Sequence, residues 1–261
     1  MIPILEARGL SKRYGPIIAA HDLNFSIARG EVVALVGDNG AGKSTLVKML
    51  SGVIKPDEGQ IVHAGQEVSF SSPQDARSRG IETIYQDLSL APNRDVVANL
   101  YLGREMVMQG WLKPFGFLDR NAMVQASGAL LRELGAKINS ITGVPVGHLS
   151  GGQQQAIAIA RAAAWAKDVL FMDEPTASLG VEQSQAVLHL ARRVAEKGVA
   201  VVLITHILPH VVEVADRVVV LKQGSIIADQ PAAETDTEQL IRLIVGFDLN
   251  RVRPNGPAAT A

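Results

Sequence analysis

Nine consecutive residues, GDNGAGKST at 37–45, place three glycines beside one lysine and two hydroxyl side chains. The stretch satisfies the pattern G-x-x-x-x-G-K-[ST] in full, which is typical of a loop that holds phosphate groups. Glycines let the backbone approach a ligand closely, so that its amides can turn toward anionic oxygens. We therefore expect a nucleotide's phosphate tail to be bound by Gly37, Asp38, Asn39, Gly40, Ala41, Gly42, Lys43, Ser44 and Thr45.

Two side chains in this stretch have the chemistry for specific contacts. Lys43 offers a point charge to the β- and γ-phosphates, and Ser44 offers a hydroxyl oxygen to Mg²⁺. The helix expected from Lys43 onward would add its positive dipole end. The alternative is a glycine-rich turn without a ligand, but the apolar run before the loop and the helical pattern after it are the context that a phosphate loop requires.

Two acids follow the apolar residues VLFM, at the end of a predicted buried strand. Ligands of open α/β sheets bind at the carboxyl ends of the strands. Asp173 could hold Mg²⁺ there through water, and Glu174 could accept a proton from an attacking water molecule. Acids at strand ends can also be simply solvated, so the interpretation depends on the phosphate loop lying nearby.

Two more polar residues end apolar runs. His206 follows VVLIT, and its imidazole could hydrogen-bond a γ-phosphate, although a lone histidine is more often structural. Gln86 ends IETIYQ, and its amide could contact both Mg²⁺ and water. We therefore include both residues in the predicted site.

A second candidate anion site opens the alanine-rich helical stretch after LSGGQQQ. Ser150 is a natural N-cap, and Gly151 and Gly152 leave bare amides at a positive helix end. The alternative is plain capping, which needs the serine but not two glycines. The large separation from the phosphate loop suggests that one copy of the chain completes the site of another.

Strand and helix patterns alternate along the chain, which indicates an α/β fold with a helical insertion. Apolar or alternating runs predict strands over 4–14, 21–30, 31–37, 81–87, 168–175 and 199–206. They also predict hairpins over 59–70 and 217–229, the second turned at Gln223–Gly224. Helical spacing predicts helices over 44–52, 119–136, 151–167, 181–198 and 235–246.

Composition excludes several classes of protein. The 261 residues carry a formal net charge of −1, which argues against a nucleic-acid binder that relies on a global positive field. No cysteine is present, so disulfides, thiolate zinc sites and cysteine nucleophiles are excluded. No apolar run reaches the roughly 18 residues needed to span a bilayer, and we expect the chain to lie outside the membrane.

Over roughly residues 4–245 the chain resembles the nucleotide-binding subunits of ABC transporters. The order of motifs that carries this resemblance is Tyr14, GDNGAGKST, YQD, LSGGQQQ, VLFMDEPTASLG and ITH. It implies a P-loop NTPase fold: an ABC cassette with a RecA-like core, an antiparallel β subdomain and a helical insertion. ATP and Mg²⁺ are the implied cofactors.

The resemblance also implies how the chain is divided. Residues 1–261 would form a single ABC ATPase domain. The core with the β subdomain would take 1–86 and 168–250, and the helical subdomain would take 87–167. Residues 251–261 would be a flexible tail.

Several residue roles follow from the resemblance alone. Tyr14 should stack on adenine, and Gln86 should lie in the mobile loop that joins the core to the helical subdomain. A second copy, or a homologous ATPase, should pair head to tail with this chain. Ser150 and Gly152 of one copy would then face the γ-phosphate held by Lys43 of the other.

A finer resemblance is to bacterial carbohydrate importers of the ribose, fructose and xylose type. NLYLGRE at 99–105 and PTASLGVEQ at 175–183 carry it, and Gly180 stands where most ABC subunits have an acid. This resemblance implies a membrane permease as partner and, indirectly, a periplasmic sugar-binding protein. It also implies a peripheral place on the cytoplasmic face of the inner membrane.

Two rival functions are weighed. A soluble ABC ATPase acting on nucleic acid or ribosomes is disfavoured by the near-neutral charge and the sugar-type motifs, so we expect no nucleic-acid partner. A subunit that binds ATP without turnover is disfavoured because Glu174 and His206 are both present.

Overall fold

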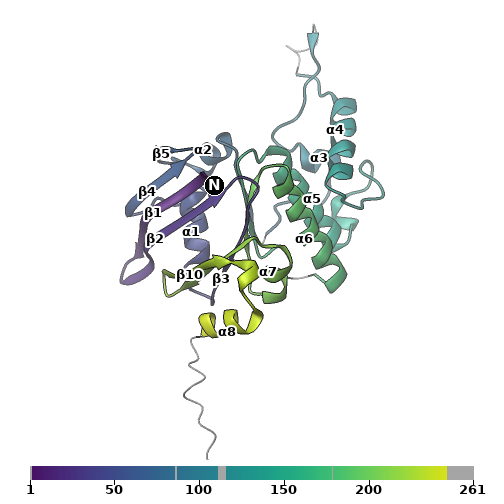
Figure 1. Ribbon diagram of the computed structural model, residues 1–261. Helices are drawn as coiled ribbons and strands as arrows, with labels where there is room; N and C mark the ends of the chain where they lie inside the picture. Colours follow the sequence, from purple (N-terminus) through teal and green to yellow (C-terminus); the bar gives the residue numbers. More distant parts are fainter. Residues whose placement is uncertain (1, 86, 111–115, 178, 246–261) are drawn as a thin grey trace, which may run out of the picture.

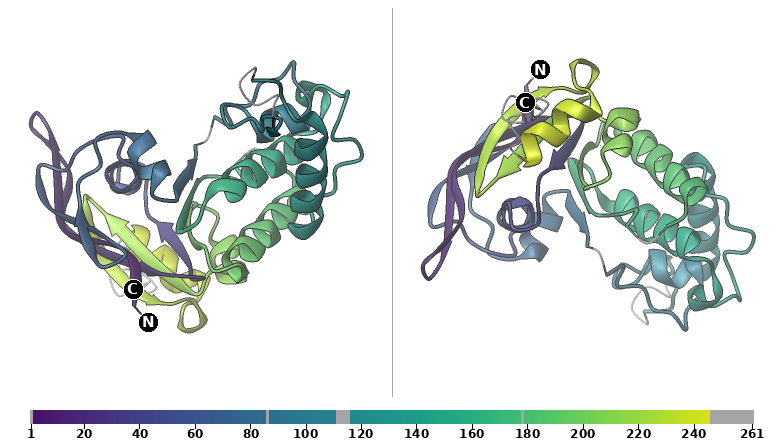
Figure 2. Two further views of the ribbon diagram at one scale, coloured as in Figure 1. Left: turned by 90° about the horizontal axis from the view of Figure 1, so that it is seen from above. Right: turned by 90° about the horizontal axis from the view of Figure 1, so that it is seen from below.

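The computed structural model describes residues 2–85, 87–110, 116–177 and 179–245 (Figure 1). Its strands form one six-stranded and one four-stranded sheet, with helices packed around them. Seen from above, the four-stranded sheet lies in one half of the molecule and the long helices in the other (Figure 2). The predicted tail at 251–261 lies outside the described residues.

The central sheet has the strand order β10-β9-β3-β8-β7-β6. Five of its strands pair in parallel, and β10 pairs with β9 antiparallel. β3 and β8 are buried along their whole length, as near-continuous apolar runs of a parallel sheet require. The strands are β3 Val32–Val36, β6 Ile81–Ile84, β7 Val169–Asp173, β8 Ala200–Ile204, β9 Arg217–Lys222 and β10 Ser225–Pro231.

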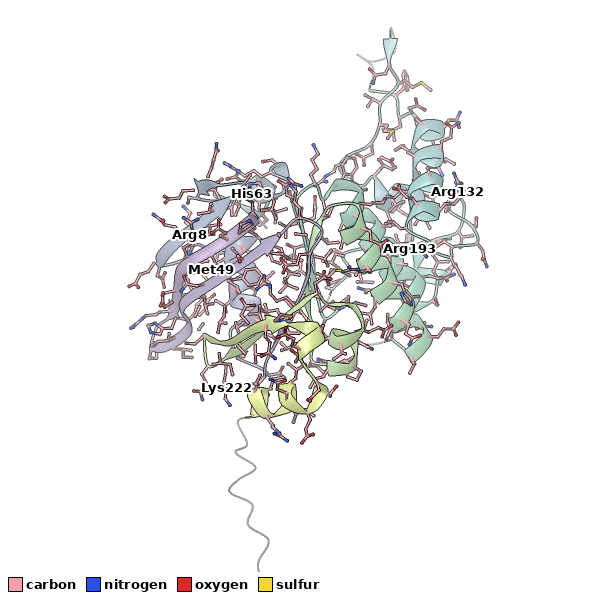
Figure 3. The ribbon with its side chains drawn as sticks, in the orientation of Figure 1. Arg8, Met49, His63, Arg132, Arg193 and Lys222 are labelled. Atoms are coloured by element: carbon pink, nitrogen blue, oxygen red, sulfur yellow. The ribbon has the colours of Figure 1, made fainter. Side chains whose placement is uncertain are left out.

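The antiparallel sheet has the order β2-β1-β4-β5 and covers helix α1, Lys43–Leu50. Its strands are β1 Pro3–Tyr14, β2 Ile17–Ala28, β4 Glu58–His63 and β5 Gln66–Val68. Leu46, Met49 and Leu50, the predicted apolar face of α1, are buried in a cluster with residues of both sheets (Met49 is labelled in Figure 3). At the end of β4, His63 Nε2 lies 2.8 Å from Asp168 Oδ2, which ties this sheet to the start of β7 (Figure 3).

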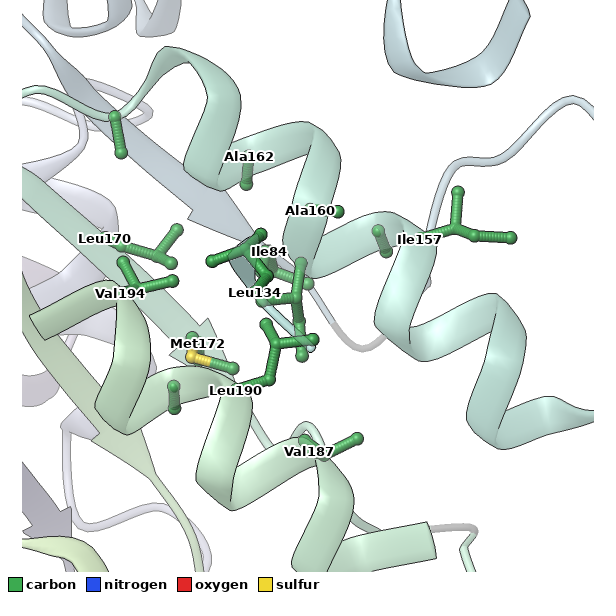
Figure 4. Packing of buried hydrophobic residues seen from close by; sticks show 14 of the residues in the cluster. Ile84, Leu134, Ile157, Ala160, Ala162, Leu170, Met172, Val187, Leu190 and Val194 are labelled. Carbon is green, nitrogen blue, oxygen red and sulfur yellow. The ribbon is translucent and has the colours of Figure 1, made fainter. Parts of the chain in front are cut away.

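Helices pack on both faces of the central sheet, and the helix at Pro73–Ser78 lies on the same face as α1, with Ala76 in the same apolar cluster. The helices are α2 Pro73–Ser78, α3 Val96–Leu100, α4 Arg120–Glu133, α5 Gly151–Trp165, α6 Val181–Glu196, α7 Leu208–Val214 and α8 Thr237–Val245, with short 3-10 turns at Val146–His148 and Ala232–Glu234. Apolar residues of α6 pack directly on the sheet, for example Val194 beside Leu170 and Leu190 beside Met172 (Figure 4). The helices at 87–167 therefore share one apolar cluster with the central strands. The predicted boundaries of the helical subdomain, 87 and 167, remain a prediction.

The predicted elements correspond to observed ones with shifts of a few residues at their ends. Asp119 caps α4 by accepting from the amide of Ala122, as its position before the helical pattern indicates. The hairpin between β9 and β10 turns at Gln223 and Gly224, both with positive φ. The sequence patterns missed the short helices α2, α3 and α7 because each is under two turns long. Within the described ranges, no helix has the length and apolar character to cross a bilayer.

Candidate functional site

Three neighbouring strands bring the predicted residues to one edge of the central sheet. Asp173 at the end of β7 is in register with Ile204 of β8, which is in register with Leu35 of β3. The phosphate-type loop follows β3, and the segment with His206 follows β8. The acids, the histidine and the loop therefore share the edge at which ligands of parallel sheets bind.

At both ends of the loop between β3 and α1, the neighbouring backbone leaves no room for a side chain larger than that of glycine. A Cβ on Gly37 would lie 2.2 Å from the Leu221 carbonyl oxygen, and one on Gly42 would lie 2.6 Å from that of Ala19. Both residues also have left-handed φ angles, 147° and 106°. The sequence therefore needs glycine here for close backbone packing, which keeps the loop tightly bent at the start of α1.

Lys43 is buried at the first turn of α1, with 7% of its surface exposed. Its Nζ donates to the carbonyl oxygens of Gly37 at 2.6 Å and Asp38 at 2.9 Å. Burial lowers the pKa of its ammonium, while the charges of Glu174, Asp173 and Asp38 oppose that shift. The ammonium thus lies within the loop, and the negative charges of Asp173 and Glu174 act on it.

Glu174 occupies a strained backbone conformation directly after β7. Its φ of 48° is left-handed, which is rare for a residue with a side chain and recurs at functional sites. Its amide donates to the Ile204 carbonyl at 3.0 Å, and its Oε1 lies 3.2 Å from His206 Nδ1. Burial raises the pKa of the neighbouring Asp173 carboxyl, the charge of Glu174 raises it further, and Lys43 acts in the opposite direction.

A cavity of about 650 Å³ lies over this edge. Its lining residues are Gly37, Asp38, Asn39, Glu174, His206, Leu208, Ile241 and Ile244. Sequence reasoning missed the last three. Ile241 and Ile244 are three residues apart on α8, so helical spacing marks them as one face, but nothing local indicates that this face meets the loop at 37–39.

Comparison with known proteins identifies the family. The family model described as "ABC transporter" matches residues 20–177. The chain belongs to this family. A relative named "Xylose/arabinose import ATP-binding protein XylG", from Sulfolobus acidocaldarius, is 44% identical over 97% of the chain and 98% of its own length. "Fructose import ATP-binding protein FrcA" from Rhizobium meliloti is 48% identical over 85% of the chain and 86% of its own length.

Solved ABC structures share the fold. The structure described as cbiO1 from Clostridium perfringens, part of an ABC transporter complex, has a TM-score of 0.77 and 26% identity, covering 97% of this chain and 98% of that one. A nucleotide-free ATP-binding cassette of an ABC transporter matches with a TM-score of 0.78 and 24% identity over 95% and 97%. The predicted P-loop ABC cassette fold is therefore confirmed.

Tyr14 lies on the hairpin beside the phosphate loop of this ABC ATPase. It ends β1, is 47% exposed and pairs with Ile17 at the start of β2. Lys12 Nζ lies 6.0 Å from the centre of its ring. Since β2 passes against Gly42 at Ala19, the hairpin carries Tyr14 alongside the loop. Its accessible ring is compatible with the predicted adenine contact, which remains a prediction.

Ser150 caps α5 as the sequence indicates. Its Oγ accepts from the Gln153 amide at 3.3 Å, and Gln153 Oε1 accepts from the Ser150 amide at 3.1 Å. In the ranges that the structure covers, no hydrogen bond or ion pair joins 150–152 to the loop at 37–45. Gln86 lies outside the described residues, so its predicted contacts remain a prediction.

The donor set fits a nucleotide with Mg²⁺. Ser44 is exposed at the start of α1, and the Asp173 carboxylate is half-buried at the end of β7, on the same edge of the sheet. Hydroxyl and carboxylate oxygens, together with phosphate oxygens and water, are the ligands that Mg²⁺ prefers. The buried ammonium of Lys43 lies at the same loop and suits the phosphates themselves.

Proposed function

We propose that the chain is the ATP-hydrolysing subunit that energises import of a sugar through a partner membrane permease. The observation that carries this proposal is the meeting of Lys43, Asp173, Glu174 and His206 at one sheet edge. The names of the xylose/arabinose and fructose import relatives support the sugar. The chain would be peripheral, on the cytoplasmic face of the inner membrane, and would respond indirectly to a periplasmic sugar-binding protein.

The residues divide the chemistry among them. The amides of 37–45 and the Lys43 ammonium would hold the phosphates, and Ser44, Asp173 and Gln86 would hold Mg²⁺, which neutralises phosphate charge. Glu174 would accept the proton of the attacking water. In its charged form His206 would donate through Nδ1 to Glu174 and through Nε2 to a γ-phosphate oxygen.

Two measurements test the sugar-import proposal. One asks which membrane protein binds the chain, and the other asks which sugars accelerate its ATP hydrolysis. We expect a membrane permease to co-purify with the chain from a detergent extract. Xylose, arabinose, fructose or ribose, added with the cognate binding protein, should then raise the rate of Mg–ATP hydrolysis several-fold. Stimulation by ribosomes or nucleic acid, with no permease recovered, would instead support the soluble rival.

We propose further that two copies pair head to tail and share each nucleotide. The capping box on α5 uses the amide of Gln153, and Gly151 at the helix start is exposed. The amides of Gly151 and Gly152 could therefore face an anion, as helix N-termini commonly do. Ser150, Gly151 and Gly152 of one copy would complete the site built on Lys43 of the other.

Mixing two inactive variants tests the shared site. In a heterodimer of Ser150→Arg and Lys43→Ala chains, one composite site is intact and the other carries both changes. Random pairing at equal amounts makes half of the dimers mixed, so we expect recovery of at most about a quarter of wild-type ATPase activity. Full recovery of wild-type activity would contradict the shared arrangement.

A further inference from the structure

Two histidines that follow β8 contact the loop that leaves β7, one just past the strand end and one on α7. His206 Nδ1 lies 3.2 Å from Glu174 Oε1, and His210 Nδ1 lies 3.2 Å from the Thr176 hydroxyl. His206 is exposed, whereas His210 is half-buried on α7. The proposed chemistry uses Glu174 and His206 and gives the second pair no role.

Thr176 is a buried anchor within this loop. It is 2% exposed, and its carbonyl accepts from the Leu179 amide at 3.2 Å. The Glu174 carbonyl accepts from the Ala177 amide at 3.3 Å. The bond from Ala177 closes a turn over Glu174–Ala177 that contains Thr176, so we expect a shift at Thr176 to move the backbone of Glu174.

Residues on both sides of Thr176 contact parts of the proposed machinery. Before it, Glu174 holds a left-handed φ of 48°, a conformation that persists only where the surroundings enforce it. After it, the Leu179 side chain packs near the start of α5, where a Cβ built on Gly151 would lie 3.6 Å from Leu179 Cδ2. Thr176 therefore lies in the chain between the proposed base and a contact with the helix end that would face the partner copy.

We propose that His210 is a positioning residue for ATP hydrolysis, whose hydrogen bond to Thr176 holds the turn from Glu174 to Ala177 in its reactive geometry. The inference rests on the proposed ATPase function. Burial lowers the pKa of His210, with the charge of Glu213 opposing that shift. The Nδ1 of a neutral imidazole can accept a hydrogen bond that the Thr176 hydroxyl donates.

Four substitutions and a double variant test the bond. His210→Leu and Thr176→Val remove one partner each, while His210→Asn and Thr176→Ser retain a polar group at the same place. We expect each of the first two to lower kcat about fivefold with the KM for ATP within twofold of wild type. The conservative variants should recover most of the loss, and His210→Leu with Thr176→Val should be no slower than either alone.

The matched control is His189→Leu, which changes an exposed histidine on α6. Its kcat should equal that of wild type. Thermal melts report whether each variant folds. If His210→Leu does not fold, Thr176→Val, which keeps the shape of the side chain, provides the test. An unchanged kcat in the folded variants, or losses that multiply to about 25-fold in the double variant, would overturn the positioning role.

The experiment separates the two proposals. Wild-type protein without ATPase activity would contradict the proposed function itself. Wild-type activity together with a rise in KM rather than a fall in kcat would leave the function intact and refute the role of His210.

Discussion

Glu174→Gln is expected to lower the ATP turnover number about 100-fold or more while ATP binding is retained. Glutamine has the shape of glutamate but cannot accept the proton of an attacking water molecule. Its proposed role as the base rests on its position directly after β7, where its charge acts on Lys43 and its Oε1 lies 3.2 Å from His206 Nδ1. A complex that binds ATP but hydrolyses it slowly should accumulate as a dimer.

Three measurements check this result: phosphate release, ATP affinity by calorimetry, and oligomeric state with and without ATP. The matched control is Glu182→Gln, which makes the same change on the exposed first turn of α6. It should leave turnover within twofold of wild type. If Glu174→Gln still turned over ATP at more than a tenth of the wild-type rate, another group would have to be the base.

The part of the site that sequence could predict depends on strand ends. The parallel strands β3, β7 and β8 are short apolar runs, and the residues at their ends lie at the carboxyl edge of the sheet. This is why Asp173, Glu174 and His206 could be placed near the loop at 37–45 from one sequence. Ser150 could be placed for a different reason, because an N-cap acts on amides only three residues away.

The parts that sequence could not predict depend on contacts between distant segments. Ile241 and Ile244 line the same cavity as Asp38, about two hundred residues earlier, and α8 shows only that it has an apolar face. The bond between Thr176 and His210 depends on how α7 begins, and α7 was too short to be recognised. The φ of Glu174 and the carbonyl contacts of Lys43 are likewise set by tertiary packing.

Lys43→Ala is expected to raise the dissociation constant for ATP about 10- to 100-fold, which corresponds to the loss of one or two charge-assisted hydrogen bonds. The Lys43 ammonium is already buried and already donates to the carbonyls of Gly37 and Asp38. A phosphate would replace neutral carbonyl acceptors by charged ones, which strengthens the same donor. Burial disfavours the charged form of the Lys43 ammonium. An anionic phosphate therefore stabilises this ammonium more than it would stabilise that of an exposed lysine.

The control for Lys43→Ala is Lys48→Ala, which removes the same charge from the exposed face of α1. Net charge changes equally in the two variants, so a general electrostatic attraction would weaken ATP binding equally in both. If Lys43 contacts the phosphates directly, Lys43→Ala weakens ATP binding, whereas the affinity of Lys48→Ala for ATP stays within threefold of wild type. Calorimetry with Mg–ATP, together with a thermal melt to show that both variants are folded, distinguishes the two. Equal affinities for Lys43→Ala and wild type would mean that the loop at 37–45 holds phosphate through its backbone amides alone.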